Sequence, residues 1–338
     1  MSRLLEVEDL QVSFKTYGGE VKAVRGVDFY LNQGEVLAVV GESGCGKSVT
    51  AQSIMGLLPK KVSRIKGGSV TFEGEEILGL PKKQMQAIKG SKIGLISQDP
   101  MTSLNPTMMV GKQIAEVIKK HTDIAKNQIK VRVIELLAMV GLPNPEQRYS
   151  QYPHELSGGM RQRVLIAMAI SCDPQLIIAD EPTTALDVTI QAQILDLLKD
   201  LQKSLDTSIM IITHDLGVVA EVAQRVAVMY AGVIVESGTV EEIFENPDHP
   251  YTWGLLNSIP KYGSGEKDRL IPIQGSPPDL FAPPTGCPFA ARCEYAMEIC
   301  VQEMPDKKRT SETHHARCWL NDPRAPLVKD LISAGRAE

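Results

Sequence analysis

The chain has 338 residues, of which 43% are hydrophobic and 23% charged, and its formal net charge is −5. These values suit a well-packed protein of one large domain or two, and the slightly acidic balance gives no support to a nucleic-acid-binding surface. No apolar run reaches the length of a membrane span and the first ten residues contain no signal segment, so we expect a cytosolic chain whose thiols stay reduced.

Two kinds of hydrophobic pattern predict the elements in chain order. Residues 4–31 alternate in short segments broken at Gly18-Gly19 and Gly26, which is typical of antiparallel strands. Beyond them, continuous apolar strands alternate with helices, which favours a mostly parallel, covered sheet and an α/β fold. The expected elements are a strand over 34–41, a helix to about 58, helices over 104–170 interrupted at 141–143 and 152–153, a strand over 176–180, an amphipathic helix over 188–205, a strand over 208–213, a short helix, and a strand over 226–236.

Proline becomes dense after Asn246-Pro247, which marks a change in organisation. This composition predicts a tail of loops rather than a second α/β domain. We therefore divide the chain into a domain over 1–245, with a helical subdomain at about 104–170, and a small C-terminal tail domain over 246–338.

The segment Gly41-Glu-Ser-Gly-Cys-Gly-Lys-Ser48 stands between a buried strand and a helix and has the spacing of a phosphate-binding loop. Its glycines let backbone amides surround the β- and γ-phosphates at a helix N-terminus. Lys47 would lie between those phosphates, and the hydroxyl of Ser48 would ligate Mg²⁺. The alternative is a chance glycine turn at the start of a helix. Cys45 stands where serine is commoner, and we interpret it as a tolerated small residue.

Acidic residues end the next buried strand, at Asp180-Glu181. Asp180 could hold the water shell of the metal, and Glu181 could polarise the attacking water. A helix cap or a solvated turn is the alternative. His214, after the third strand, is similarly placed to contact a γ-phosphate, although a lone histidine is more often structural.

A second glycine-rich segment, Leu156-Ser-Gly-Gly-Met-Arg-Gln162, precedes a helix, which Ser157 can cap. A second anion site at a helix end would be redundant in a simple kinase or GTPase. With the phosphate loop, this segment makes the chain resemble the ATPase subunit of an ABC transporter, a P-loop NTPase, from about Leu4 to Gly238. In that resemblance residues 157–159 are the signature motif, Gln98 the Q-loop, residues 185–187 the D-loop and His214 the switch histidine.

The resemblance implies two ATPases that dock head to tail, so that the signature motif of one covers the ATP of the other. It also implies that Phe14 stacks on adenine, although Tyr17 is close enough to compete and Phe14 could instead be a core residue. Glu181, His214 and Gln98 would be catalytic, and Ser48, Gln98 and Asp180 would hold Mg²⁺. The nucleotide-binding residues that the resemblance implies are Phe14, Gly41, Ser43, Gly44, Cys45, Gly46, Lys47, Ser48, Val49, Gln98, Asp180, Ser157, Gly158 and Gly159.

Three features resemble a narrower group, the ATPases of oligopeptide and dipeptide importers: Met160, residues 98–106 and residues 249–252. This resemblance implies two permease subunits, a second ATPase (a copy or a paralogue) and an extracytoplasmic peptide-binding protein as partners, at the cytoplasmic face of the membrane. Residues 98–110 would face a permease, although an ordinary surface turn explains them equally simply.

Four cysteines crowd the tail, at Cys287, Cys293, Cys300 and Cys318. In a reducing compartment they could hold Zn²⁺, hold an iron–sulfur cluster, or be unligated thiols, and paired C-x2-C knuckles are absent. The peptide-importer ATPases have a similar tail, and that resemblance implies a [4Fe–4S] cluster with a structural role, zinc being the second choice. His314 or His315 could replace Cys318 as a ligand.

Two other functions remain open from the sequence. The same motor could serve an importer of nickel or another solute. A less favoured hypothesis is a soluble ABC ATPase that acts on nucleic acid or the ribosome; the single ATPase unit, the absence of sustained heptads and the acidic charge argue against it, and we expect no nucleic-acid partner.

Overall fold

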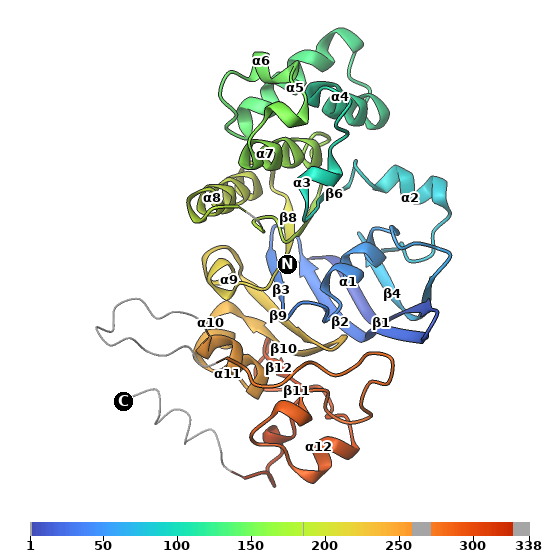
Figure 1. Ribbon diagram of the computed structural model, residues 1–338, viewed down its shortest axis with the longest axis vertical. Helices are drawn as coiled ribbons and strands as arrows, with labels where there is room; N and C mark the ends of the chain where they lie inside the picture. The colour runs from blue at the N-terminus through green and yellow to red at the C-terminus, as the bar shows by residue number, and fades with distance from the viewer. Residues whose placement is uncertain (1, 185, 259–271, 327–338) are drawn as a thin grey trace, which may run out of the picture.

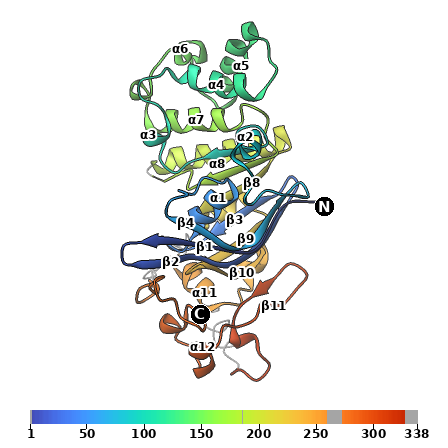
Figure 2. The same ribbon diagram turned by 90° about the vertical axis from the view of Figure 1, so that its right-hand side faces the viewer.

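A computed structural model describes residues 2–184, 186–258 and 272–326. Two β-sheets occupy its middle, a layer of helices lies at one end, and the C-terminal tail lies at the other (Figure 1). The same three levels are seen after a quarter turn (Figure 2). The α/β class and the separate helical segment that the sequence predicts are confirmed.

The N-terminal residues form an antiparallel sheet, as predicted. Its strand order is β2 (Gly19–Asn32), β1 (Arg3–Thr16), β4 (Ser63–Phe72) and β5 (Glu75–Glu76). Glycine at position 26 does not end a strand: β2 continues through it, and the register against β1 shifts nearby instead. The expected break was therefore wrong.

The second sheet has eight strands and carries the phosphate loop. Its order is β11 (Lys308–Arg309), β12 (His315–Ala316), β10 (Val233–Thr239), β9 (Arg225–Tyr230), β3 (Val36–Val40), β8 (Ser208–Thr213), β7 (Leu176–Asp180) and β6 (Ile93–Ile96). The strands from β9 to β6 are parallel, and only the β10, β12 and β11 edge is antiparallel. The prediction of a mostly parallel sheet is confirmed.

Alternation along the buried strands divides the core in two. Successive side chains of a strand point to opposite faces of its sheet. On β3, Val36, Ala38 and Val40 join a core that includes the helical layer, whereas Leu37 and Val39 join the core against the antiparallel sheet. Because both faces are covered, the strand is apolar throughout, which is why the sequence marks it so clearly.

The segment predicted as one strand over 226–236 is two. β9 and β10 form an antiparallel hairpin whose turn is Ala231-Gly232. Both turn residues have positive φ, 47° and 83°, as a tight two-residue hairpin requires. Alanine is an uncommon residue in that position, so the sequence lacks the usual turn signal.

Helices cover the parallel sheet and build the helical layer. Their bounds are α1 (Lys47–Ile54), α2 (Lys82–Ile88), α3 (Pro100–Ser103), α4 (Val110–His121), α5 (Lys126–Met139), α6 (Pro145–Tyr149), α7 (Gly158–Ala169), α8 (Val188–Leu205), α9 (Leu216–Val222), α10 (Val240–Glu245), α11 (Pro250–Asn257) and α12 (Glu298–Gln302). The interruptions predicted at 141–143 and 152–153 are present. Within the described ranges no helix combines the length and the apolar character needed to cross a bilayer.

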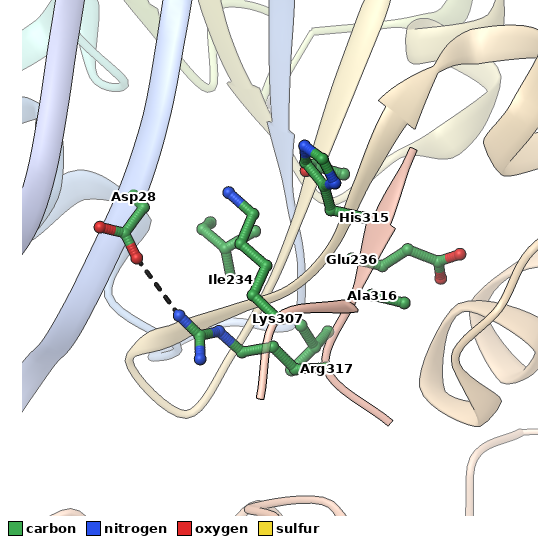
Figure 3. Close-up of a pocket in the computed structure, with 9 residues that line it drawn as sticks. Asp28, Ile234, Glu236, Lys307, His315, Ala316 and Arg317 are labelled. Carbon is green, nitrogen blue, oxygen red and sulfur yellow. Dashed lines mark hydrogen bonds and ion pairs between the residues drawn. The ribbon is translucent and has the colours of Figure 1, made fainter. Parts of the chain in front are cut away.

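The tail packs against the sheet edge rather than apart from it. Its strand β12 pairs with β10 through Glu236↔Ala316 and Ser237↔His315. Beside this pairing, Arg317 forms an ion pair with Asp28 of β2, with 3.3 Å between Nη2 and Oδ2 (Figure 3). The short strands were not predicted, because two-residue strands leave no periodic pattern in a sequence.

Candidate functional site

The phosphate-binding segment forms the turn between β3 and α1, as the sequence predicts. Gly46 ends this turn with a φ of 107°, and a Cβ there would lie 2.5 Å from the carbonyl oxygen of Ala23. Only glycine fits both restrictions. Ser43 and Gly44 are exposed, whereas Cys45 is buried in the core below. The loop is therefore open to solvent at residues 43 and 44, and burial of Cys45, which raises the pKa of its thiol, keeps that side chain inert.

Lys47 is buried, with 5% of its surface exposed. Its Nζ donates hydrogen bonds to the carbonyl oxygens of Gly41, at 2.7 Å, and Glu42, at 3.0 Å. The ammonium is thus held inside the loop by two neutral acceptors. Phosphate oxygens of a nucleotide could replace either acceptor with a charge-assisted hydrogen bond.

A hydrogen bond joins the phosphate loop to the end of β7: the hydroxyl of Ser48 donates to Oδ1 of Asp180 at 2.9 Å. The two residues meet because β3 and β7 lie on either side of β8 and the carboxyl ends of parallel strands share one edge of a sheet. Burial raises the pKa of Asp180, although the hydrogen bond from Ser48 and the charge of Lys47 oppose that rise. A hydroxyl and a carboxylate at one point are ligands suited to Mg²⁺.

Glu181 follows β7 in a left-handed conformation, with a φ of 47°, and its backbone nitrogen donates to the carbonyl of Ile212 at 2.9 Å. Non-glycine residues rarely adopt this conformation, and such strain is concentrated at functional sites. The conformation turns the Glu181 side chain toward Gln98, whose Nε2 lies 3.0 Å from Oε2. His214 Nδ1 lies 3.6 Å from Oε1. The three residues predicted as catalytic are thus gathered around one carboxylate.

One contact of this group was not predicted. The hydroxyl of Thr184 donates to Oε2 of Glu181 at 2.9 Å and so shares that oxygen with Gln98. The spacing of three residues after a strand end could have indicated it, since a turn brings such residues together. The D-loop prediction begins at residue 185, which lies outside the described residues; Asp187 caps α8 by accepting from the backbone nitrogen of Ile190 at 2.9 Å.

The signature residues lie at the start of α7 in the helical layer, and the phosphate loop lies at the start of α1 beside the sheets (Figure 1). Ser157 caps α7, accepting from the backbone nitrogen of Met160 at 3.4 Å. Ser157 and Gly158 are exposed, while a Cβ on Gly159 would lie 2.8 Å from Ile190. The predicted cap is confirmed, and the exposed end of the helix is available to a partner.

The aromatic candidates for adenine stacking differ in exposure. Phe14 is half-buried and packs against the core between the two sheets, together with Val49 of α1. Tyr17, in the turn between β1 and β2, is fully exposed. The stacking role of Phe14 stays a prediction.

The cysteines of the tail are mostly buried. Cys287, Cys300 and Cys318 have less than a tenth of their surface exposed, and Cys293 is half-buried. Burial raises the pKa of Cys287 to about 11 and that of Cys318 to about 12, and repulsion by the other thiolates of the group adds to both shifts. Across residues 2–184, 186–258 and 272–326, however, no three His, Cys, Asp or Glu side chains are arranged to hold a metal ion.

Comparisons with known proteins agree with this arrangement. The family "ABC transporter" matches residues 24–184, and the family "Oligopeptide/dipeptide transporter, C-terminal region" matches residues 235–300. The chain is 61% identical to the oligopeptide transport ATP-binding protein OppD of Bacillus subtilis (strain 168), over 97% of this chain and 92% of that one. It is 54% identical to the dipeptide transport ATP-binding protein DppD of the same organism, over 96% and 97%.

Solved structures are similar over about 70% of the chain. The dimeric ATP-binding cassette MJ0796, bound to ADP and Pi after hydrolysis, has a TM-score of 0.63 at 25% identity, over 70% of this chain and 99% of that one. The cbiO1 subunit of the transporter complex cbiONQ from Clostridium perfringens has a TM-score of 0.61 at 29% identity, over 73% and 92%. The chain therefore belongs to the family of oligopeptide and dipeptide transport ATP-binding proteins, within the ABC transporter ATPases.

Proposed function

We propose that this chain is the ATP-hydrolysing subunit of an importer of dipeptides or oligopeptides. One observation carries the proposal: the Ser48–Asp180 hydrogen bond lies directly beside Glu181, around which Gln98 and His214 gather. A metal-ligand pair next to a carboxylate is what hydrolysis of a phosphoanhydride by water requires. The solute comes from the relatives, whose names specify oligopeptide and dipeptide transport.

The residues of the site would divide the work as follows. The amides of the phosphate loop and Lys47 would bind the β- and γ-phosphates, while Ser48, Asp180 and Gln98 would hold Mg²⁺, which neutralises phosphate charge when bound. Glu181 would accept a hydrogen bond from the attacking water and take its proton, and His214 would bind the γ-phosphate. Phe14 would stack on adenine.

The resemblance to peptide-importer ATPases supplies the proposed partners, and two exposed surfaces support them. Ser157 and Gly158 are open at the start of α7, where they could cover the nucleotide of a second ATPase, and closure and reopening of that pair would drive transport. Met101 of α3, within residues 98–110, is 63% exposed and could contact a permease. We thus place the chain at the cytoplasmic face of the membrane with two permeases, a second ATPase and, through the complex, an extracytoplasmic peptide-binding protein.

A reconstitution experiment tests the function. Affinity purification of the tagged chain from detergent-solubilised membranes should recover permease subunits, and the complex in vesicles should take up labelled peptide only with ATP. The same vesicles loaded with a Lys47→Ala chain should take up none. Uptake of nickel but not of peptide would show that the importer carries nickel. Recovery of ribosomes or DNA in place of permeases would overturn the proposal.

We also propose that Cys287, Cys293, Cys300 and Cys318 hold a [4Fe–4S] cluster that stabilises the tail. Burial raises the pKa of Cys287, Cys293 and Cys318 and so disfavours their thiolates in the metal-free chain, and a bound cation would offset that cost. Three neighbouring residues of the tail, Phe289, Ala290 and Met297, pack in or against the main core, so the cysteines lie beside that core.

Metal analysis distinguishes the ligands. Protein purified without oxygen should be brown, with broad absorption near ~400 nm and about four irons per chain, and Cys318→Ser should lose most of both. Colourless protein with stoichiometric zinc would show that the cysteines hold zinc and not the cluster. If the purified protein contained neither iron nor zinc, the four thiols would be unligated and the proposal would be overturned.

A further inference from the structure

Arg292 belongs to the tail, yet its guanidinium group reaches the phosphate loop; only 5% of its side chain is exposed. All five of its N–H groups have acceptors. Nη1 and Nη2 bind the two carboxylate oxygens of Glu42 at 2.7 and 3.0 Å, and Nη1 also binds the hydroxyl of Tyr230 at 3.2 Å. The carbonyls of Ile273 and Gln274 accept from Nη2 at 3.1 Å and from Nε at 2.8 Å. This geometry suits arginine and not lysine.

Glu42 is the second residue of the phosphate loop and is held at three points. Its carboxylate binds Arg292, its backbone nitrogen donates to the hydroxyl of Tyr251 at 2.9 Å, and its carbonyl accepts from Nζ of Lys47 at 3.0 Å. The third contact links the tail to the cation that phosphates would engage. A displacement of Glu42 would therefore displace an acceptor of Lys47.

A close-packed group of aromatic rings lies behind these contacts. The rings of Tyr230 and Tyr251 lie 4.6 Å apart, and Phe289, three residues before Arg292, packs against both at 5.3 and 5.4 Å. All three rings are nearly inaccessible to solvent. Because a close-packed aromatic group resists displacement, the tail segment fixes where the guanidinium group stands.

We propose that Arg292 is a positioning residue for ATP binding, which acts on the phosphate loop through Glu42. Its guanidinium group binds both carboxylate oxygens of Glu42 and so restrains that residue, and its charge neutralises a carboxylate that belongs to the phosphate loop. The inference rests on the proposed nucleotide site at this loop. It makes the tail, which the sequence separates from that loop by 250 positions, a part of the nucleotide site.

The alternative is that the ion pair only attaches the tail. The chain offers a matched control, because Arg317 also joins the tail to the N-terminal part of the molecule, through Asp28 at 3.3 Å (Figure 3). That pair lies in the β12–β10 region and not at the phosphate loop. A variant at Arg317 therefore measures the effect of losing a tail contact alone.

The test uses the full chain in the purified transporter complex and titrates MgATP and a non-hydrolysable ATP analogue. Arg292→Gln should raise the Kd of the analogue and the KM for ATP about ten-fold, with kcat changed less than about two-fold. The reason is that the geometry of the phosphate loop affects the affinity for nucleotide more than the rate of the hydrolysis step. Arg317→Gln should lower the melting temperature without changing Kd or KM. Arg292→Lys, which keeps the charge but not the fork, should give an intermediate Kd.

Coupling is measured in a Glu42→Gln background, where Arg292→Gln should change Kd less than about two-fold, since the partner through which it acts has been altered. An undisturbed Kd and KM in Arg292→Gln, or an equal rise in Arg317→Gln, would overturn the inference. If Arg292→Gln does not fold, an unchanged Kd in Arg292→Lys would overturn it too. Lys47→Ala serves as reference: should it bind the analogue normally, the nucleotide site itself is misplaced, which is a separate failure.

Discussion

Gln98 and Glu181 meet across the carboxyl edge of the sheet, with 3.0 Å between the amide nitrogen of one and a carboxylate oxygen of the other. They follow neighbouring parallel strands, β6 and β7, and 83 positions separate them. The contact keeps the carboxylate oriented and leaves its second oxygen to face His214. Such an orientation is what a group that takes a proton from water requires.

Replacement of Glu181 by glutamine should therefore remove hydrolysis and keep binding. The amide preserves the shape but cannot accept a proton, so kcat should fall roughly 100-fold or more while the Kd for ATP changes little. Single-turnover hydrolysis and an ATP titration measure the two quantities. Glu221→Gln, which alters a surface carboxylate paired with Lys199, is the control. Normal turnover in Glu181→Gln would remove the residue from its role.

Loss of the Lys47 ammonium should weaken binding rather than stability. Its resting acceptors are two carbonyls of the loop, and phosphate would be a stronger partner. Lys47→Ala should raise the Kd for MgATP at least about ten-fold in equilibrium titration. Lys199→Ala, at a partly exposed surface lysine, should leave Kd unaltered. Equal affinities in the two variants would contradict the assignment of the loop.

His249 should make the protein sensitive to acid. It is 1% exposed, its Nδ1 accepts from the backbone nitrogen of Tyr251 at 3.0 Å, and burial lowers its pKa to about 3. An unfolded histidine titrates near ~6.5, so its contribution to stability is complete above that pH and is lost as the pH falls toward 3. The slope reaches about 1.4 kcal/mol per pH unit.

The variant His249→Asn keeps a side chain able to cap α11 and removes the titration. Its free energy of unfolding, from urea denaturation at several pH values, should depend less on pH between about 6.5 and 4 than that of the unaltered chain. Parallel curves for the two proteins would show that His249 does not titrate as its burial implies.

His314 should act in the opposite direction. Burial disfavours its charge, but the hydrogen bond to Glu236, at 2.8 Å, and the charge of Asp248 outweigh burial and raise its pKa. A raised pKa stabilises the fold fully below about 6.5, and that stabilisation is lost as the pH rises through the folded-state value. His314→Gln should thus flatten the alkaline side of the stability profile. If His314→Gln left the alkaline pH dependence of the free energy of unfolding unchanged in denaturation experiments, this prediction would be wrong.

The sequence predicts the phosphate loop, β7 and β8 well because each is specified by neighbours in the chain. Gly46 must be glycine for local reasons, and a doubly buried strand is apolar at every position. Gln98 and His214 gather around Glu181 because they follow β6 and β8, the parallel strands on either side of β7, and β6 is not among the strands expected from the sequence.

Other features depend on distant contacts and leave no local signal. The left-handed backbone at Glu181 is imposed by its bond to Ile212, and the Arg292–Glu42 pair joins residues 250 positions apart. The β9–β10 hairpin was mistaken for one strand because Ala231-Gly232 interrupts two apolar runs with little polar character. Tertiary packing decides each of these.

The pairing of β12 with β10 also bears on solubility. A sheet edge with free amides and carbonyls invites another chain, and here the outermost strand is the two-residue β11, Lys308–Arg309, whose length and charge discourage such pairing. A chain shortened before residue 308 would lose the strand partners of Glu236 and Ser237 and leave that edge of the seven-residue β10 unpaired. Removal of the tail should therefore promote aggregation through that strand, and not only remove a loop.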